Sequence, residues 1–255
     1  MMELTGKTVC RGIAIGKIKM YSKNENQILR NKIADTEAEI RRYEDAKEKA
    51  LKELEALYEK AVIEVGEDNA EIFNVHAMML DDEDYNDSVV NIITGQQVNA
   101  EYAVATTGDN FSEMFAGMDD EYFKARSVDV RDISERLIRV MSGGQESSVL
   151  GEEPVILMAE DIAPSETVQM DKTKLLSFVT RLGSANSHTA ILARTMGIPA
   201  LVGVDIDQKY EGKLAIVDGY EGKCIVDPDS EVLAAYTEKK QQDDEKKKLL
   251  QQLRG

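Results

Sequence analysis

The sequence has few of the features that disulfide-stabilised or membrane proteins need. Its two cysteines, Cys10 and Cys224, lie far apart and predict neither a disulfide framework nor a cysteine metal site. No apolar run approaches the roughly 18–20 residues of a membrane-spanning helix. The first residues, MMELTGK, lack a basic region followed by an apolar core, so we expect no secretory signal and a cytosolic protein.

Basic residues are also scarce: 31 lysines and arginines accompany 48 aspartates and glutamates, and the formal net charge is −17. Such a surface repels nucleic acid and anionic lipid and attracts a basic protein partner. The charge is equally compatible with a role in solubility alone. The histidines are His76 and His188, and no carboxylate lies at ligand spacing from His188, so we expect no metal site.

What the sequence does contain is, first, a charged stretch over residues 31–141 with the apolar spacing of amphipathic helices. Thr36 and Glu39 form a capping-box pattern at its first helix. Gly66, Gly95 and Asn99 are typical of helix boundaries. We expect helices over residues 36–65, 69–80, 83–93, 99–115 and 119–141. The short connections between them favour an all-α helical bundle.

The flanking segments are short apolar runs separated by Gly, Pro and Asp, which is typical of strands. We expect strands over residues 12–21, 154–159, 175–180, 200–202, 214–217 and 223–226, and a helix over 187–196. This alternation predicts an α/β domain of residues 1–24 and 143–230, interrupted by the bundle over residues 25–142. Residues 231–255 are helical and charged, as in a connector between domains or a solvated tail.

One loop-to-helix junction carries residues suited to chemistry. Asn186 is a strong N-cap, which starts the helix at Ser187 or His188. His188 then lies in the first turn, where unpaired N–H groups bind anions and the helix dipole favours a neutral, nucleophilic imidazole. Further donors for phosphate oxygens are Ser184, Asn186, Ser187 and Thr189. The pattern favours a histidine that accepts and returns a phosphoryl group, although most histidines at helix starts are caps or surface residues.

A longer segment around this histidine resembles the phosphohistidine motif of the PEP-utilising enzymes: it reads SHTAILAR over residues 187–194 and GIPALVG over residues 197–203. These enzymes include enzyme I of the bacterial sugar phosphotransferase system, pyruvate phosphate dikinase and PEP synthase. Further segments resemble enzyme I in particular: GIAIGK (12–17), IFNVHAMMLDDED (72–84), DEYFK (120–124), VRDI (130–133) and APSET (163–167). The resemblance covers nearly the whole chain and is to the N-terminal half of enzyme I.

The resemblance implies an α/β phosphohistidine (swivelling) domain, an inserted helical bundle that docks the small phosphocarrier protein HPr, and a C-terminal linker helix. It also implies that His188 takes the phosphoryl group on Nε2, that Thr167 hydrogen-bonds the imidazole, and that Arg126 faces the partner. In enzyme I, PEP and Mg²⁺ bind to a C-terminal barrel domain, for which this sequence has no candidate site. We therefore expect no cofactor in this chain, exchange of phosphate with HPr, and no use of PEP by this chain alone.

Two positions depart from the enzyme I pattern, which usually reads Gly-Gly-any-Thr before Ser-His. Ser184 replaces the second glycine, so we expect strain if that position needs a positive φ. Asn186 replaces the threonine and caps a helix equally well. Arg194 matches the arginine of the motif, but six residues place it about 240° around the helix from His188. We expect Arg194 to pack, or to contact another domain or partner, rather than to bind the phosphate.

An acidic face bearing methionines is expected on the second and third helices. Flexible methionines beside a charged rim suit a protein-binding surface, and the negative charge steers a basic partner. The residues assigned to partner binding are Glu67, Asp68, Glu71, Met78, Met79, Asp82, Glu83, Asp84 and Arg126. The alternative is a solvated face over a buried methionine stripe. We expect His76 to be packed or partner-facing rather than a second phosphorylation site.

Other functions stay open on the sequence alone. They are the phosphohistidine domain of a dikinase-like enzyme, a regulatory module that holds phosphate as a signal, and an inert scaffold. If a phosphate on His188 is to reach a partner on the bundle, the domains must move, and we expect hinges at residues 23–30 and 142–148.

Overall fold

A computed structural model describes residues 1–22, 28–143, 150–184 and 187–254. The chain divides into two compact units: Glu25–Ser147 forms the helical unit, and Met1–Asn24 with Ser148–Gly255 forms the α/β unit. Both expected hinges lie partly outside the described residues. Of the helices within the described ranges, none has both the length and the apolar composition of a bilayer span.

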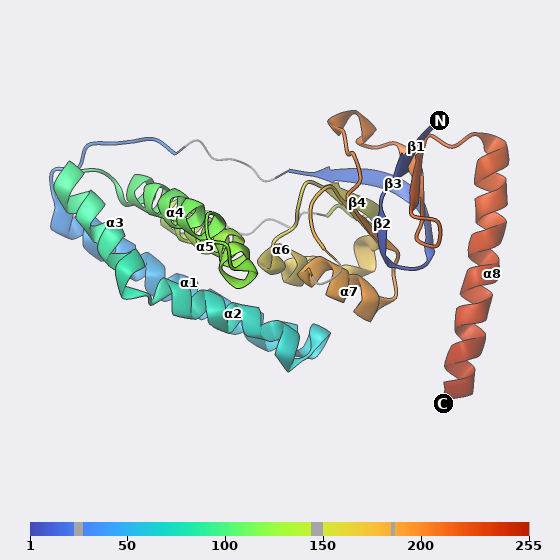
Figure 1. Ribbon diagram of the computed structural model, residues 1–255, viewed down its shortest axis with the longest axis horizontal. Coiled ribbons are helices and arrows are strands. Elements are labelled where there is room, and N and C mark those ends of the chain that lie inside the picture. The colour runs from blue at the N-terminus through green and yellow to red at the C-terminus, as the bar shows by residue number, and fades with distance from the viewer. Residues whose placement is uncertain (23–27, 144–149, 185–186, 255) are drawn as a thin grey trace. The chain divides into compact units, whose positions relative to one another are not determined.

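The helical unit consists of amphipathic helices, with α2 packed along α1 and α4 along α5 (Figure 1). Their bounds are α1 Thr36–Val65, α2 Glu67–Leu80, α3 Glu83–Gln96, α4 Ala100–Ala116 and α5 Glu121–Met141. The largest buried side chains are Tyr43, Leu54, Phe73, Leu80, Tyr85, Ile93, Ile133 and Leu137. The predicted bundle is confirmed. The end predicted at Gly95 is wrong, because α3 continues to Gln96 and ends where Gln97 adopts a left-handed conformation with φ 51°.

The start of α1 differs from the predicted capping box. Its N-cap is Asp35, whose side chain accepts the Ala38 N–H at 3.0 Å, and Thr36 is the first helical residue. Glu39 is buried instead of folding back on the cap, and its carboxylate accepts the Ala100 N–H at 2.8 Å. Glu39 therefore satisfies a donor at the start of α4 and ties α4 to α1.

Replacing this glutamate should destabilise the helical unit. Glu39→Ala leaves the buried Ala100 N–H without its acceptor and removes a partner that lies 2.8 Å from Arg42. We expect a loss of about 1–3 kcal/mol in the free energy of unfolding. Urea unfolding, followed by the helical signal in far-ultraviolet circular dichroism, measures it. The control Glu44→Ala, at an exposed position of α1, should change stability by less than about 0.5 kcal/mol; equal effects would contradict the role of Glu39.

The α/β unit is built on one mixed sheet with the order β1-β8-β7-β3-β4-β5-β6-β2 in the described residues. The strands are β1 Met2–Thr5, β2 Lys7–Cys10, β3 Ile13–Tyr21, β4 Val155–Ala159, β5 Leu175–Thr180, β6 Ala200–Val202, β7 Leu214–Asp218 and β8 Lys223–Val226. The strands from β3 to β6 are parallel, and the outer ones pair antiparallel. β1 and β2, at the two ends of the sheet, add to the predicted strands; each is too short to show a clear alternation.

The carboxyl ends of parallel strands meet at one edge of a sheet, where ligand sites of open α/β folds usually lie. Two helices begin there: α6 Pro164–Gln169 follows β4, and α7 His188–Met196 follows β5. The sequence did not predict α6, because six residues are too few to show helical periodicity. The unit also has 3₁₀ turns at η1 Lys172–Lys174 and η2 Gln208–Tyr210.

The last helix, α8 Ser230–Arg254, is in part a core element of the α/β unit. Tyr236 packs in a buried cluster with Ile13, Ile216 and Ile225, and its hydroxyl donates to Asp218 Oδ2 at 2.8 Å. Leucines near the end of α8, by contrast, are exposed. The first half of α8 is therefore fixed to the sheet by packing, which a fully solvated tail would not be.

Candidate functional site

The first turn of α7 is capped by Ser187. Its side chain accepts the Ala190 N–H at 3.2 Å, and its own N–H donates to the Ser184 carbonyl at 3.1 Å. The prediction that Asn186 is the N-cap is therefore wrong. Asn186 lies outside the described residues, and its part in a phosphate cradle stays a prediction. The helix ends at Met196, as predicted, and Gly197 after it adopts a left-handed conformation.

The loop before the cap turns on one glycine. Gly183 has a φ of +109°, in the region that favours glycine, whereas Ser184 is not among the residues with positive φ. The strain expected at Ser184 is therefore absent, because the retained glycine takes the unusual conformation. Thr180, at the end of β5, donates its hydroxyl to the Leu182 carbonyl at 2.6 Å and closes the turn. A small pocket beneath the loop is lined by Gly183, Ser187, Thr189 and Asp161, among others.

His188 is the first residue of α7, and its ring nitrogen Nε2 is buried. The side chain as a whole is half-buried. Thr189 beside it is buried, and its hydroxyl points to the Ile162 carbonyl at 3.5 Å, ahead of α6. Thr189 therefore packs between α7 and the residue ahead of α6, and its expected role as a donor to phosphate oxygens stays a prediction.

Thr167 lies on α6, which packs against α7. Its side chain is fully buried, and Oγ1 donates to the Pro164 carbonyl at 2.8 Å. Among the described residues the Thr167 hydroxyl donates to Pro164 and not to His188, but its oxygen can still accept a ring N–H, so the expected hydrogen bond to the imidazole stays a prediction. The structure thus brings Thr167 to the right pair of helices.

Arg194 is exposed on α7. Its charge, like that of Lys247, acts on the Cys10 thiol, although burial is the larger influence and raises the pKa of Cys10. α7 packs against β2, the strand that ends at Cys10. The effect of Arg194 on Cys10 agrees with a position about 240° around the helix from His188.

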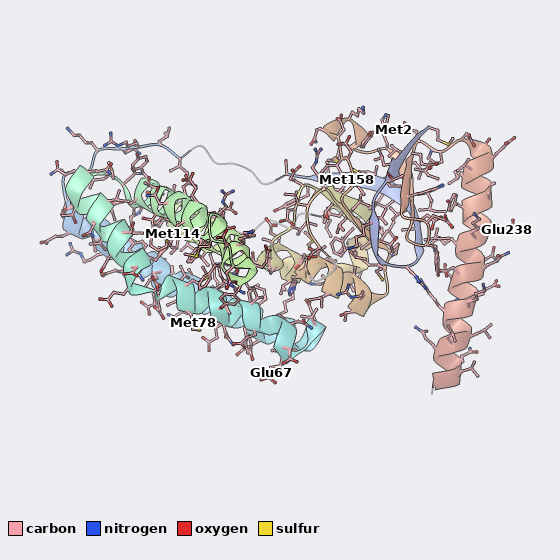
Figure 2. The ribbon with its side chains drawn as sticks, viewed as in Figure 1. Met2, Glu67, Met78, Met114, Met158 and Glu238 are labelled. Carbon is pink, nitrogen blue, oxygen red and sulfur yellow. The ribbon has the colours of Figure 1, made fainter. Side chains whose placement is uncertain are left out.

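The predicted acidic face is exposed on the helical unit. We use this name for Glu67, Asp68, Glu71, Asp82, Glu83 and Asp84, all of which are exposed. Figure 2 shows Glu67 and Met78 projecting from α2. The two residues are about three helical turns apart, so they lie on the same side of the helix. Met78 is 71% exposed and Met79 is half-buried, so the alternative of a buried methionine stripe is wrong for Met78.

Exposed aromatic side chains at the tip of α4 and α5 are a feature that sequence reasoning missed. Tyr122 and Phe123 are both exposed, and Phe123 stacks on Phe115 with ring centroids 6.2 Å apart. Met114 is exposed beside them on α4. The signal was present in the sequence: adjacent residues of a helix point about 100° apart, so Tyr122 and Phe123 cannot both face the core centre.

Arg126 and His76 belong to one buried network in the helical unit. The Arg126 side chain is 19% exposed, its Nη1 lies 2.9 Å from Asp129 Oδ2, and its guanidinium lies 4.7 Å from the Tyr122 ring centroid. Asp129 Oδ1 lies 2.9 Å from Nε2 of His76, which is 1% exposed. His76 is thus a packed residue, which is one of the two roles predicted for it. Arg126 exposes only a small part of its side chain to a partner.

The described residues contain no group of three His, Cys, Asp or Glu side chains that could hold a metal ion. The start of α7 offers an imidazole and the N–H groups of a helix N-terminus. A neutral imidazole is a nucleophile, and the N-terminal N–H groups attract anions. Together they form a site at which an anionic group can be bound and transferred.

Comparisons with known proteins identify the class. Residues 5–126 match the family model described as "PEP-utilising enzyme, N-terminal", and residues 151–222 match "PEP-utilising enzyme, mobile domain". The chain belongs to the PEP-utilising enzymes.

Within this family the likeness is to enzyme I. The phosphoenolpyruvate-protein phosphotransferase of Priestia megaterium is 39% identical over 93% of this chain, and that of Bacillus subtilis is 37% identical over 94%. The chain spans 42% of the length of each.

Solved structures agree with this assignment. A solution structure of an enzyme I protein is 38% identical, with a TM-score of 0.74 over 94% of this chain and 98% of that one. The N-terminal domain of a nitrogen enzyme 1 is 27% identical, with a TM-score of 0.60 over 92% and 98%. The predicted fold, a phosphohistidine α/β domain with an inserted helical bundle, is confirmed.

The Ser187 cap allows stability and chemistry at this site to be separated. Ser187→Ala removes the acceptor for the Ala190 N–H and should lower the stability of the α/β unit by about 1 kcal/mol. Ser187→Asp should restore the stability, because Asp caps as well as Ser, but its charge should repel an incoming phosphoryl group. Thermal unfolding measures the stability of the α/β unit. The rate at which a phosphoryl donor labels His188 measures the repulsion. Full labelling of Ser187→Asp would contradict an anion site at this turn.

Proposed function

We propose that this chain carries a phosphoryl group on Nε2 of His188 and exchanges it with the small phosphocarrier protein HPr in the cytosol. The group comes from PEP, which binds with Mg²⁺ to a separate C-terminal domain, as the resemblance to enzyme I implies. The observation that carries the proposal is the place of His188: it opens a capped helix at the carboxyl edge of the sheet, within the segment that matches the mobile domain.

The chemistry follows from that position. The bond between phosphorus and the donor atom of the carrier breaks as the bond between phosphorus and Nε2 forms, and the reverse step returns the group. The positive end of α7 disfavours a protonated ring, so the attacking lone pair stays available. The same partial charge attracts the phosphoryl oxygens and lowers the energy of a transition state in which negative charge is spread over them.

Docking of the carrier is assigned to the acidic face with Met78 at its centre. Negative charge speeds the encounter with a basic partner, and an exposed methionine adapts to an apolar contact. Tyr122 and Phe123 extend the apolar area on the helical unit. His188 and the acidic face belong to different units, and the resemblance to a swivelling domain implies that the α/β unit moves to bring His188 to the docked carrier.

The acceptor can be tested by intact mass. After mixing with phospho-HPr, the wild-type chain should gain one acid-labile phosphate, and His188→Ala should gain none, because the other histidine, His76, is 1% exposed and hydrogen-bonded with Asp129. His76→Gln is the matched control and should still be labelled. An unlabelled, folded wild type would overturn the proposal, and a phosphate that persists in the presence of excess HPr would instead favour a regulatory module.

PEP and Mg²⁺ without any other protein should leave His188 unlabelled. We expect this because the proposal places the PEP site and the metal in a domain outside this chain. The same mass measurement checks it, with phospho-HPr as the positive control. Labelling of His188 by PEP and Mg²⁺ alone would show that the chain holds its own PEP site and would contradict this part of the proposal.

The docking surface can be tested by charge reversal. Glu67→Lys with Glu71→Lys should raise the KM for phospho-HPr about 10-fold at low salt, and less at high salt, with kcat unchanged. The control is Glu238→Lys with Glu245→Lys, which changes the net charge by the same amount at two exposed glutamates of α8 (Figure 2 labels Glu238). Steady-state exchange with labelled phospho-HPr measures both. Equal effects of the two changes would indicate attraction by net charge rather than a docking face.

A further inference from the structure

Tyr21 and Glu166 form a polar contact that the proposed transfer does not use. Tyr21 is the last residue of β3, and its hydroxyl donates to Glu166 Oε1 at 2.5 Å. Tyr21 pairs with Ala159 at the end of β4, so it lies at the carboxyl edge where α6 and α7 begin. The contact thus joins the central strand of the sheet to the helix beside His188.

Glu166 uses its second oxygen within α6. Oε2 accepts the Ala163 N–H at 2.7 Å, and the Ala163 carbonyl accepts the N–H groups of Glu166 and Thr167 at 3.1 and 3.2 Å. The Thr167 hydroxyl closes the same turn on Pro164. A helix of six residues has little stability of its own, so these contacts and the tie to Tyr21 determine where its first turn lies.

The residue that precedes the first turn of α6 lies close to the first turn of α7. The residue before Ala163 is Ile162, whose carbonyl faces the hydroxyl of Thr189 at 3.5 Å. Thr189 is buried and directly follows His188 in the first turn of α7. A displacement of the α6 turn therefore moves the surface against which the residue next to His188 is packed.

We propose that Tyr21 and Glu166 are positioning residues for phosphoryl transfer at His188. They hold the first turn of α6 in place, and this turn fixes the first turn of α7 and the direction of the imidazole. Neither side chain touches the phosphoryl group. The inference rests on the proposed function, since it assigns a role in that reaction.

The fold supplies a matched control for the loss of one tyrosine hydroxyl. Tyr236 also donates to a carboxylate in the α/β unit, Asp218 Oδ2 at 2.8 Å. Asp218 pairs with Ile13, at the opposite end of β3 from Tyr21. Eight residues of strand place the two contacts about 26 Å apart. Tyr21→Phe and Tyr236→Phe thus remove the same kind of hydrogen bond at opposite edges of one sheet.

The experiment compares exchange with phospho-HPr in the wild type, Tyr21→Phe, Glu166→Gln and Tyr236→Phe. Tyr21→Phe should lower the rate constant at saturating carrier about 5-fold to 10-fold, with an unchanged KM because docking is on the helical unit. Glu166→Gln should do the same. Tyr236→Phe should exchange at the wild-type rate although its thermal midpoint falls as much as that of Tyr21→Phe.

A second measurement does not depend on the carrier. The long-range ¹H–¹⁵N spectrum of the His188 imidazole should shift in Tyr21→Phe and stay unchanged in Tyr236→Phe. Wild-type rates and an unshifted imidazole in Tyr21→Phe would overturn the positioning role while leaving the proposed function intact. A raised KM with unchanged kcat would also overturn it, since the pair would then act on docking. An unlabelled wild type would overturn the proposed function itself.

Discussion

The hydrogen bond from the Ala190 N–H to the Ser187 side chain fixes the residue at which α7 begins. Because the helix starts there, His188 occupies its first turn, where the backbone dipole is positive. One residue earlier or later would turn the imidazole by about 100° and remove it from the loop that Gly183 forms. The sheet, the glycine turn and the short helix α6 all serve to hold this one helix start at the carboxyl edge.

The two units achieve order by different means. In the helical unit, apolar stripes fill the core, and buried carboxylates such as Glu39 and Asp129 connect helices that are distant in sequence. In the α/β unit, parallel strands supply a rigid edge, and α8 adds an apolar cover through Tyr236. The division suits a protein in which a partner is held by one unit and the reactive group is carried by the other.

Local patterns were sufficient for most elements and insufficient for their ends and partners. The helices of the bundle and the strands β3 to β8 follow from apolar spacing, because burial of one face imposes it. The predicted capping box is not formed, because the Glu39 carboxylate accepts the N–H of Ala100, some sixty residues along the chain. Thr167 shows a local contact that spacing does not reveal: its hydroxyl donates to the carbonyl of Pro164, three residues away.

The sequence by itself determined the family, the two kinds of domain, the helix that starts near His188 and the acidic face, since each is written in consecutive or periodic residues. Only the tertiary structure decided how deeply His76 is buried and that Tyr21 meets Glu166 across 145 positions of sequence. The reason is physical. Periodicity records which face of an element is buried, whereas a polar contact depends on which elements the fold brings within about 3 Å of each other.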